Sequence, residues 1–371
     1  MKINIPFFTA LSLFCFSNSI AQQTFKNEPL IVADSPKAGY AIGQDYYPNM
    51  WRISPQIPQD SLRLKLYRAK DKITFKTDKD SISFIMKPGE SKSFYVKMAN
   101  AEPAHTIITT EAYQWDHVVY RNSKQNKDIR FFYEDASNAY FDSLRKLYPT
   151  ASLIQKDKTE KEKVLSIMNW VHHRWKHNGS NSPKANDAIS ILNEAKEGGR
   201  FPCFAYAIVL RDQLAANGFD ARVLYLKLKK AETYDGAPGH VVTEVYLKDE
   251  KKWALIDGQF NIMPVLKGKS LNAVEFQKAL RTNYDDVVFT SRDKVSKREY
   301  TDFIGDYLYY LNTALDNRLL PLKDKFTVNG KTDIMLVPKG APNLTKMKFF
   351  DIKIDNCIYT HSIADFYAAP K

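Results

Sequence analysis

Cysteine is scarce in this chain, which has three in 371 residues. Cys15 lies in an N-terminal apolar segment, so Cys203 and Cys357 are the two that remain. Two cysteines cannot form a multi-disulfide framework, although a single disulfide between them is an open alternative. The residues around Cys203 favour a nucleophile instead, and Cys357 is expected to be a buried apolar residue in a strand over residues 349–360.

Long hydrophobic runs are also missing beyond the N-terminus. Lys2 precedes an apolar run over residues 5–16 that is too short to cross a bilayer, and Ser19 and Ala21 form a small-x-small cleavage site. The pattern predicts a signal peptide over residues 1–21, with the mature chain starting at about Gln22. We therefore expect a secreted or periplasmic protein without stable membrane insertion. Phe14, a bulky residue before Cys15, disfavours a lipoprotein signal.

The chain has no long block of one charge, no internal repeat and no low-complexity segment. Its formal net charge is +12, from 54 basic and 42 acidic residues. Because the lysines alternate with acids, the excess predicts a solvated surface and not a nucleic-acid site. A protein, peptide or glycopeptide substrate is the expected partner, and the sequence does not predict an oligomeric state.

Two domains are expected, because the chain is too long for one ordinary core. Residues 22–130 read as mostly β: Leu62, Leu64 and Leu66 alternate with polar residues, and residues 87–90 signal a turn. This segment predicts a small β-sandwich-like domain. Residues 131–371 mix helices and strands, so the predicted fold class is α+β, with helices packed on an antiparallel sheet in the second domain.

The second domain has a readable order of elements. Val164, Met168, Val171 and Trp175 follow a 4, 3, 4 spacing, which predicts one buried helical stripe. We expect helices over residues 135–147, 158–177, 187–195, 203–216, 273–281 and 300–313, and strands over residues 221–228, 241–247 and 253–257. The last two strands are joined by a short charged turn and predict a hairpin.

The residues that suggest chemistry are Cys203, His240 and Asp257. Cys203 opens a predicted helix, where unpaired backbone N–H groups favour a thiolate and can hold an oxyanion. His240 opens one strand of the hairpin and Asp257 ends the other, and neighbouring strands lie only about 5 Å apart. A thiol, an imidazole and a carboxylate in these roles predict nucleophilic acyl transfer, with the acid orienting the ring.

Other residues compete for parts of this site. Glu244 shares a strand face with His240 but lies roughly 13 Å along it, so Asp257 is the better partner. The backbone N–H of Cys203 is the first candidate oxyanion donor, and Trp175 or Asn178 are candidates for a second. His172, His173 and His177 are clustered in sequence without a nearby acid or cysteine, so no metal site and no cofactor is predicted.

Four segments together resemble the transglutaminase-like superfamily. They are CFAYA (203–207), LAANGFDARV (214–223), GHVVTEVY (239–246) and KWALID (252–257). The resemblance covers roughly residues 168–265 and implies a papain-like core with the catalytic triad Cys203, His240 and Asp257. Phe201, Val242 and Gly258 depart from the usual family pattern, and these changes concern the walls of the substrate site.

The resemblance implies an enzyme that works through a thioester. Members of the superfamily include cross-linking acyltransferases, cysteine proteases and amidases. We expect a secreted cysteine hydrolase or acyltransferase acting on amide or peptide bonds, with hydrolysis favoured over cross-linking. The alternative is an inert envelope protein that binds or scaffolds on the same fold.

Overall fold

The computed structural model describes residues 23–370 and divides them into two compact units. The first unit ends at Tyr113 and the second begins at Gln114. The sequence had placed this division near residue 130. Residues 114–130 belong to the second unit because they pair with its C-terminal part: the backbone N–H of Arg121 donates to the carbonyl of His361. The expected signal peptide lies outside the described residues.

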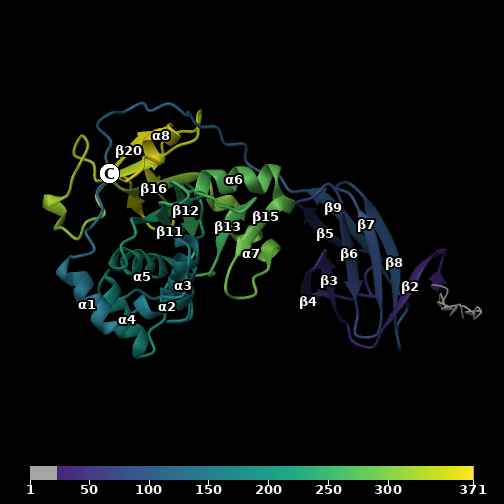
Figure 1. Cartoon of the computed structure of the whole chain (residues 1–371). Helices are drawn as coiled ribbons and strands as arrows, with labels where there is room; N and C mark the ends of the chain where they lie inside the picture. Colours follow the sequence, from purple (N-terminus) through teal and green to yellow (C-terminus); the bar gives the residue numbers. More distant parts are fainter. Residues whose placement is uncertain (1–22, 371) are drawn as a thin grey trace, which may run out of the picture. The chain divides into compact units, whose positions relative to one another are not determined.

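The first unit is a β-sandwich, as predicted (Figure 1). Side chains from both sheets meet in a core that includes Val96, Ile108, Ile73 and Phe75, each fully buried. One sheet has the order β1-β2-β8-β9-β5 and the other the order β4-β3-β6-β7. The bounds are β1 Thr24–Phe25, β2 Glu28–Ala33, β3 Lys37–Ile42, β4 Asp45–Arg52, β5 Asp60–Leu66, β6 Asp71–Lys76, β7 Ser81–Met86, β8 Ser91–Met98 and β9 Ala104–Ala112.

The second unit begins with helices and then builds a sheet. The helices before the sheet are α1 (Ala139–Leu147), α2 (Ala151–Ile154), α3 (Glu160–His172), α4 (Ala188–Lys196) and α5 (Cys203–Ala216). Thr159 and Glu162 form a capping box at the start of α3, and Asp187 caps α4 through its side chain. These caps fix where the polypeptide enters each helix.

The main sheet of this unit has six strands in the order β12-β11-β10-β16-β17-β20. All neighbours are antiparallel except β17 and β20, which are parallel. The bounds are β10 Ala221–Lys227, β11 Gly239–Leu247, β12 Lys252–Ile256, β16 Tyr310–Ala314, β17 Asp333–Leu336 and β20 Cys357–Thr360. The predicted hairpin of β11 and β12 is present, with Thr243 opposite Ile256.

Helix α5 is the centre of the second unit. It contacts β10 and β11 on one side and α1, α3 and α4 on the other. A helix covered all round must be apolar all round, and ten of its residues are buried. Its first residue, Cys203, is only partly buried. The helix therefore holds the cysteine rigidly at the edge of a packed core.

The remaining elements surround this core. A smaller sheet has the order β14-β13-β15, and β18 pairs with β19 in a hairpin. The bounds are β13 Met263–Leu266, β14 Lys269–Ser270, α6 Ala273–Thr282, β15 Val287–Thr290, α7 Lys297–Ile304, β18 Lys346–Met347, β19 Ile352–Lys353 and α8 Ile363–Phe366. Short 3-10 turns lie at Tyr284–Asp286, Gly305–Tyr307 and Leu322–Asp324.

Two helix predictions need correction. The helix predicted over 158–177 ends at His172, because the next residues turn so that Trp175 can pack on Tyr206, with ring centroids 4.3 Å apart. The helix predicted over 300–313 is wrong: α7 ends at Ile304, and β16 follows and pairs with β10. The single strand predicted over 349–360 is instead two short strands, β19 and β20, separated by residues 354–356.

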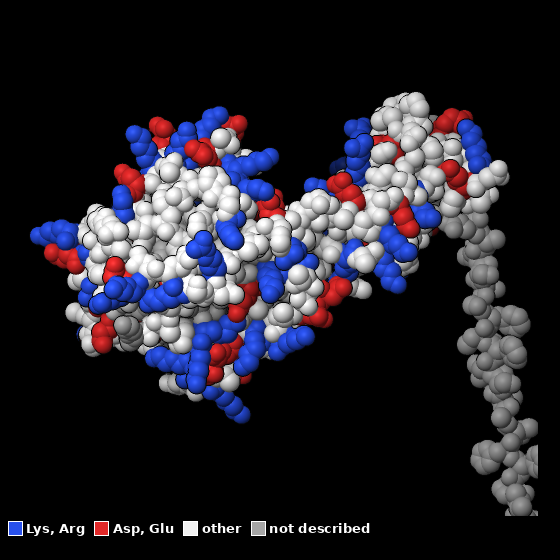
Figure 2. All heavy atoms as spheres, turned by 90° about the horizontal axis from the view of Figure 1, so that it is seen from above, with Lys and Arg blue, Asp and Glu red and all other residues white. Residues whose placement is uncertain are grey.

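The described surface carries both signs of charge. On the face seen in Figure 2, blue basic and red acidic side chains are interspersed on both units. Among residues 23–370, none of the helices combines the length and apolar character that crossing a membrane requires.

Candidate active site

Cys203, His240 and Asp257 come together in the second unit, at the start of α5 and at neighbouring ends of β11 and β12. His240 Nε2 lies 2.8 Å from Asp257 Oδ2. The strand register explains this contact: Thr243 faces Ile256, so Asp257 and His240 fall on the opposite sheet face together, as diagonal neighbours. Because a carboxylate only accepts, Nε2 carries the hydrogen and Nδ1 is left for the sulfur of Cys203.

His240 is buried, with 2% of its surface exposed, and its charge state follows from its partners. Burial lowers the pKa of this imidazole. The charge of Asp257, the hydrogen bond to it, and the hydrogen bond and charge of Cys203 outweigh burial and raise the pKa to about 9. The ring is therefore protonated at neutral pH and places a positive charge beside the sulfur of Cys203.

Asp257 is fully buried and held on every side. Its Oδ1 accepts hydrogen bonds from the backbone N–H groups of Gln259, at 2.9 Å, and Phe260, at 3.2 Å. Its Oδ2 accepts from His240 and also from the hydroxyl of Tyr300, at 2.9 Å. A carboxylate with four donors has one orientation, so it can fix the imidazole ring.

Tyr300 was not predicted as part of the site. It lies in α7 and is 1% exposed, and burial together with the charge of Asp257 raises its pKa well above the ordinary range. The hydroxyl therefore stays protonated and always donates. The sequence held no signal for this role, because Tyr300 lies 43 residues after Asp257 in a segment predicted as a plain helix.

Glu244, the rival acid, belongs to a separate network. Its Oε2 accepts from Arg222 Nη2 at 2.7 Å and from Nε at 3.1 Å, and both side chains are fully buried. Aromatic rings surround the guanidinium, among them Trp253, whose ring centroid lies 4.4 Å away. Glu244 is therefore a structural partner of Arg222, and Asp257 is the acid that reaches His240.

The start of α5, where the sequence predicts an oxyanion donor, has no side-chain cap. Pro202 caps the helix without a side-chain hydrogen bond, so the first N–H groups are not covered by a cap. Trp175, a candidate second donor, uses its indole N–H to donate to the carbonyl of Phe201 at 3.3 Å. The backbone N–H of Asn178 donates to the same carbonyl, and the Asn178 side chain is exposed. Both residues therefore anchor the segment before Cys203.

The two cysteines are free and differ in their surroundings. Cys357 is 4% exposed in β20, and burial followed by the charge of Asp333 raises the pKa of its thiol to about 12. It is a buried apolar residue, as predicted, and the disulfide alternative is not realised. Cys203 lines a cavity together with His240.

That cavity has a volume of about 420 Å³ and a mainly apolar wall that contains several aromatic rings. The residues that line it with Cys203 and His240 include Phe204, Tyr225, Phe303, Tyr307, Phe349 and Phe350. Its polar contributors are few and include Gln259, His177 and Lys227. Burial lowers the pKa of Lys227 to about 8, and that of His177 is lowered by burial and then by the charge of His240.

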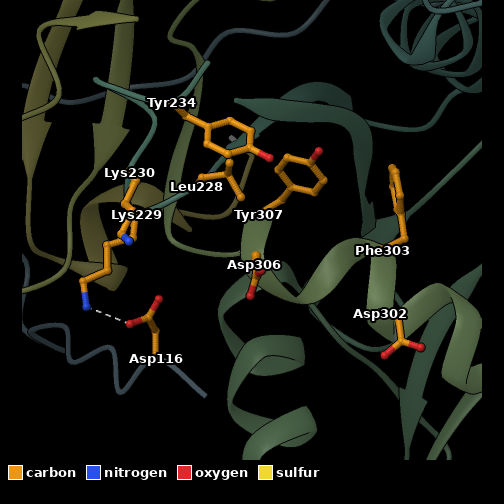
Figure 3. Close-up of a pocket in the computed structure, with 9 residues that line it drawn as sticks. All are labelled: Asp116, Leu228, Lys229, Lys230, Tyr234, Asp302, Phe303, Asp306 and Tyr307. Atoms are coloured by element: carbon orange, nitrogen blue, oxygen red, sulfur yellow. Dashed lines mark hydrogen bonds and ion pairs between the residues drawn. The ribbon is translucent and has the colours of Figure 1, made fainter. Parts of the chain in front are cut away.

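A second cavity of about 590 Å³ adjoins the first, because both are lined by Phe303 and Tyr307. In Figure 3 the ring of Tyr234 lies beside that of Tyr307, and Phe303 stands apart on α7. Lys229 pairs with Asp116 at 2.8 Å at the far end. The two cavities thus lie next to each other at Phe303 and Tyr307, and the outer one carries charges of both signs.

The clustered histidines share one cavity but differ in their other neighbours. His177 lines the cavity of Cys203, whereas His172 and His173 lie near Asp293. Asp293 comes from the loop between β15 and α7. The premise that no acid accompanies these histidines is therefore wrong, because the acid is distant in sequence and close in space.

A Cys-His-Asp site on a helix and an antiparallel sheet defines an α+β protein of the papain-like kind. Residues 149–258 match the family model described as the transglutaminase-like superfamily. Among curated proteins, none matches the chain.

Solved structures with a related fold were also found. One is a candidate cysteine protease from Cytophaga hutchinsonii, 16% identical, with a TM-score of 0.27; the match covers 47% of this chain and 59% of that one. Another is calcium-bound LapG of Legionella pneumophila, 15% identical, with a TM-score of 0.24, covering 46% of this chain and 98% of LapG. A third is red sea bream transglutaminase, 10% identical, with a TM-score of 0.24, covering 52% and 38%.

Proposed function

We propose that the protein is an exported cysteine hydrolase or acyltransferase that cleaves amide or peptide bonds through a thioester. The observation that carries the proposal is the 2.8 Å hydrogen bond between His240 and Asp257, beside Cys203 in one cavity. A structural cysteine has no need of a charged, oriented imidazole at its sulfur. Export follows from the N-terminal sequence pattern.

The reaction begins with attack of the Cys203 sulfur on the amide carbonyl carbon. The carbonyl oxygen becomes an oxyanion, and the backbone N–H of Cys203 at the start of α5 is its donor. The C–N bond then breaks, His240 gives its proton to the leaving amine, and a thioester remains. Asp257 keeps the ring in place throughout.

The thioester is resolved by a second nucleophile. His240 takes a proton from water, the resulting hydroxide attacks the carbonyl carbon, and the C–S bond breaks to release an acid and free Cys203. An amine in place of water gives a new amide. The cavity is open to solvent along its aromatic wall, which supports water as the acceptor and hydrolysis as the main outcome.

The aromatic lining supports a substrate with an apolar side chain near the scissile bond. The adjoining cavity, with Lys229 and Lys230 facing Asp302 and Asp306, supports an extended polar segment on one side of that bond. A protein, peptide or glycopeptide substrate fits both features.

The test is capture of the acyl-enzyme. Wild-type protein, Cys203→Ala and Cys357→Ala are incubated with a mixed peptide pool, quenched in acid and analysed by mass spectrometry. An adduct on Cys203 in the wild type and in Cys357→Ala, and none in Cys203→Ala, is expected. Peptide turnover that survives in Cys203→Ala overturns the mechanism, and a folded wild type without adduct or turnover supports an inert binding protein.

A further inference from the structure

We propose that His172, His173 and Asp293 form a binding site for a divalent transition-metal ion of the zinc class. His172 ends α3, His173 is the next residue, and Asp293 lies between β15 and α7. One ligand atom from each lies within 4.8 Å of the others. The three come from two segments that are about 120 residues apart in sequence and meet only in the folded chain.

The distances suit ligands of one ion better than direct hydrogen bonds. Nε2 of His172 lies 3.9 Å from Asp293 Oδ2, and Nε2 of His173 lies 3.6 Å from the same oxygen. A hydrogen bond needs a shorter separation. Ligands around tetrahedral zinc, with bonds of about 2.0–2.1 Å, lie about 3.4 Å from one another, so small side-chain shifts complete the geometry.

The contact that Nδ1 of each ring makes with a backbone carbonyl fixes the tautomer of that ring. Nδ1 of His172 lies 3.2 Å from the carbonyl oxygen of Gly258, and Nδ1 of His173 lies 2.8 Å from that of Asn169. A carbonyl oxygen only accepts, so both Nδ1 atoms carry hydrogen. The Nε2 atoms therefore turn their lone pairs toward Asp293, as metal-bound histidines do when a carbonyl holds the other nitrogen.

Asn261 orients the carboxylate of Asp293 and gives independent support for a bound ligand. It is fully buried, and its amide Nδ2 donates to Asp293 Oδ2 at 2.7 Å and to Asn169 Oδ1 at 2.8 Å. Its own Oδ1 is buried and has no hydrogen-bond partner among the described residues. A buried acceptor without a partner calls for an explanation, and an ordered water held at this site would supply the donor.

The ligand set selects the kind of ion. Two imidazoles and one carboxylate suit zinc, cobalt and nickel, whereas calcium and magnesium prefer oxygen ligands. Three protein ligands leave a fourth position for water. The side chains of His172, His173 and Asp293 are 30%, 50% and 39% exposed, so an ion can enter from solvent.

The site is linked to the carboxyl group that orients His240. The carbonyl that holds His172 belongs to Gly258, directly after Asp257, and Asn261 lies in the turn closed by the pairing of Asp257 with Ile262. The loop with Asp293 leads into α7, which carries Tyr300. A bound ion would tie these segments together and stiffen the position of Asp257, which is a positioning role and not a catalytic one.

The test measures metal binding in the Cys203→Ala background, which removes the thiol that could form a competing metal site with His240. Chelator-treated protein is titrated with Zn²⁺ by calorimetry and with Co²⁺ by visible absorption. We expect about one ion per chain, a Co²⁺ spectrum of low coordination number, and a higher Tm with Zn²⁺.

Matched variants locate the site. His173→Gln and Asp293→Asn each remove one ligand and should weaken Zn²⁺ binding at least tenfold, whereas His117→Gln, at an exposed histidine outside the cluster, should bind as the parent does. Either ligand variant suffices if the other fails to fold. Equal binding in the parent and the ligand variants, absence of Zn²⁺ binding, or a preference for Ca²⁺ overturns the proposal.

Discussion

Tyr300 and His240 donate to the same oxygen of Asp257, Oδ2, at 2.9 and 2.8 Å. Two backbone N–H groups hold the other oxygen, so the carboxylate cannot rotate away from the imidazole. The site thus depends on α7 as well as on α5 and the β11–β12 hairpin. Tyr300 acts through Asp257 and is a positioning residue.

Tyr300→Phe should lower kcat about tenfold and leave KM nearly unchanged, because one hydrogen bond to a charged group contributes about 1.5–3 kcal/mol and part of it is felt in the transition state. Steady-state kinetics on a peptide substrate gives both constants. Tyr310→Phe is the matched control: this buried tyrosine donates to the carbonyl of Pro342. Equal losses of kcat in both variants would contradict the role of Tyr300.

The stability of the protein should fall as pH rises from about 6.5 to about 9. His240 has a raised pKa in the folded protein, so its stabilising contribution is complete below 6.5 and is lost as pH passes through about 9. The interval between 6.5 and about 9 corresponds to a stabilising free energy of about 3 kcal/mol as an upper limit. Urea unfolding at several pH values, with His240→Gln subtracted, isolates this group. If the difference in unfolding free energy between the two proteins does not change with pH, the imidazole is not stabilised as a cation.

Gly239→Ala should destabilise the protein by about 1–3 kcal/mol and reduce activity. A Cβ at this position would lie 2.5 Å from the carbonyl oxygen of Leu226, so β10 and β11 would have to separate next to His240. Thermal unfolding measures the loss. Gly179→Ala is the control for stability, because its Cβ would meet only His177, at an ordinary 3.6 Å. A Tm for Gly239→Ala as high as that of the control would refute the close approach.

Glu244→Gln should lower the free energy of unfolding by about 3–5 kcal/mol, because it leaves Arg222 buried without its counter-charge. Turnover per folded molecule should stay unchanged. Asp257→Asn should instead remove most of kcat, by a factor on the order of 10⁴ as for triads of this kind, with the fold retained. If folded Glu244→Gln is as inactive as Asp257→Asn, the assignment of the orienting acid is wrong.

The helix that begins at Cys203 and the β11–β12 hairpin were predictable because their signals are local. The loop ahead of Cys203 and the apolar length of α5 mark the helix, and the breaker pair before His240 marks the strand. Pairing of β11 with β12 then follows from the short charged turn. To predict that His240 and Asp257 share one face of the sheet, only the alternation of side chains along each strand was needed.

The parts that escaped prediction depend on contacts between distant segments. Residues 305–314 contain aromatic and apolar residues that fit a helix as well as a strand. Pairing with β10 favours the strand β16 over a helix. The early end of α3 follows from the docking of Trp175 on Tyr206. Asp293 and Tyr300 reach the site through the packing of α7, which no spacing in the sequence encodes.

The order of strands in the six-stranded sheet limits how the gene can be shortened. The family match stops at residue 258, yet three of the six strands, β16, β17 and β20, come from the last third of the chain. A fragment trimmed to the matched region would expose the free edge of β10 to solvent and would lack Tyr300. Expression of the second unit alone therefore has to run from about residue 114 to the C-terminus, and shorter versions should aggregate through the uncovered strand.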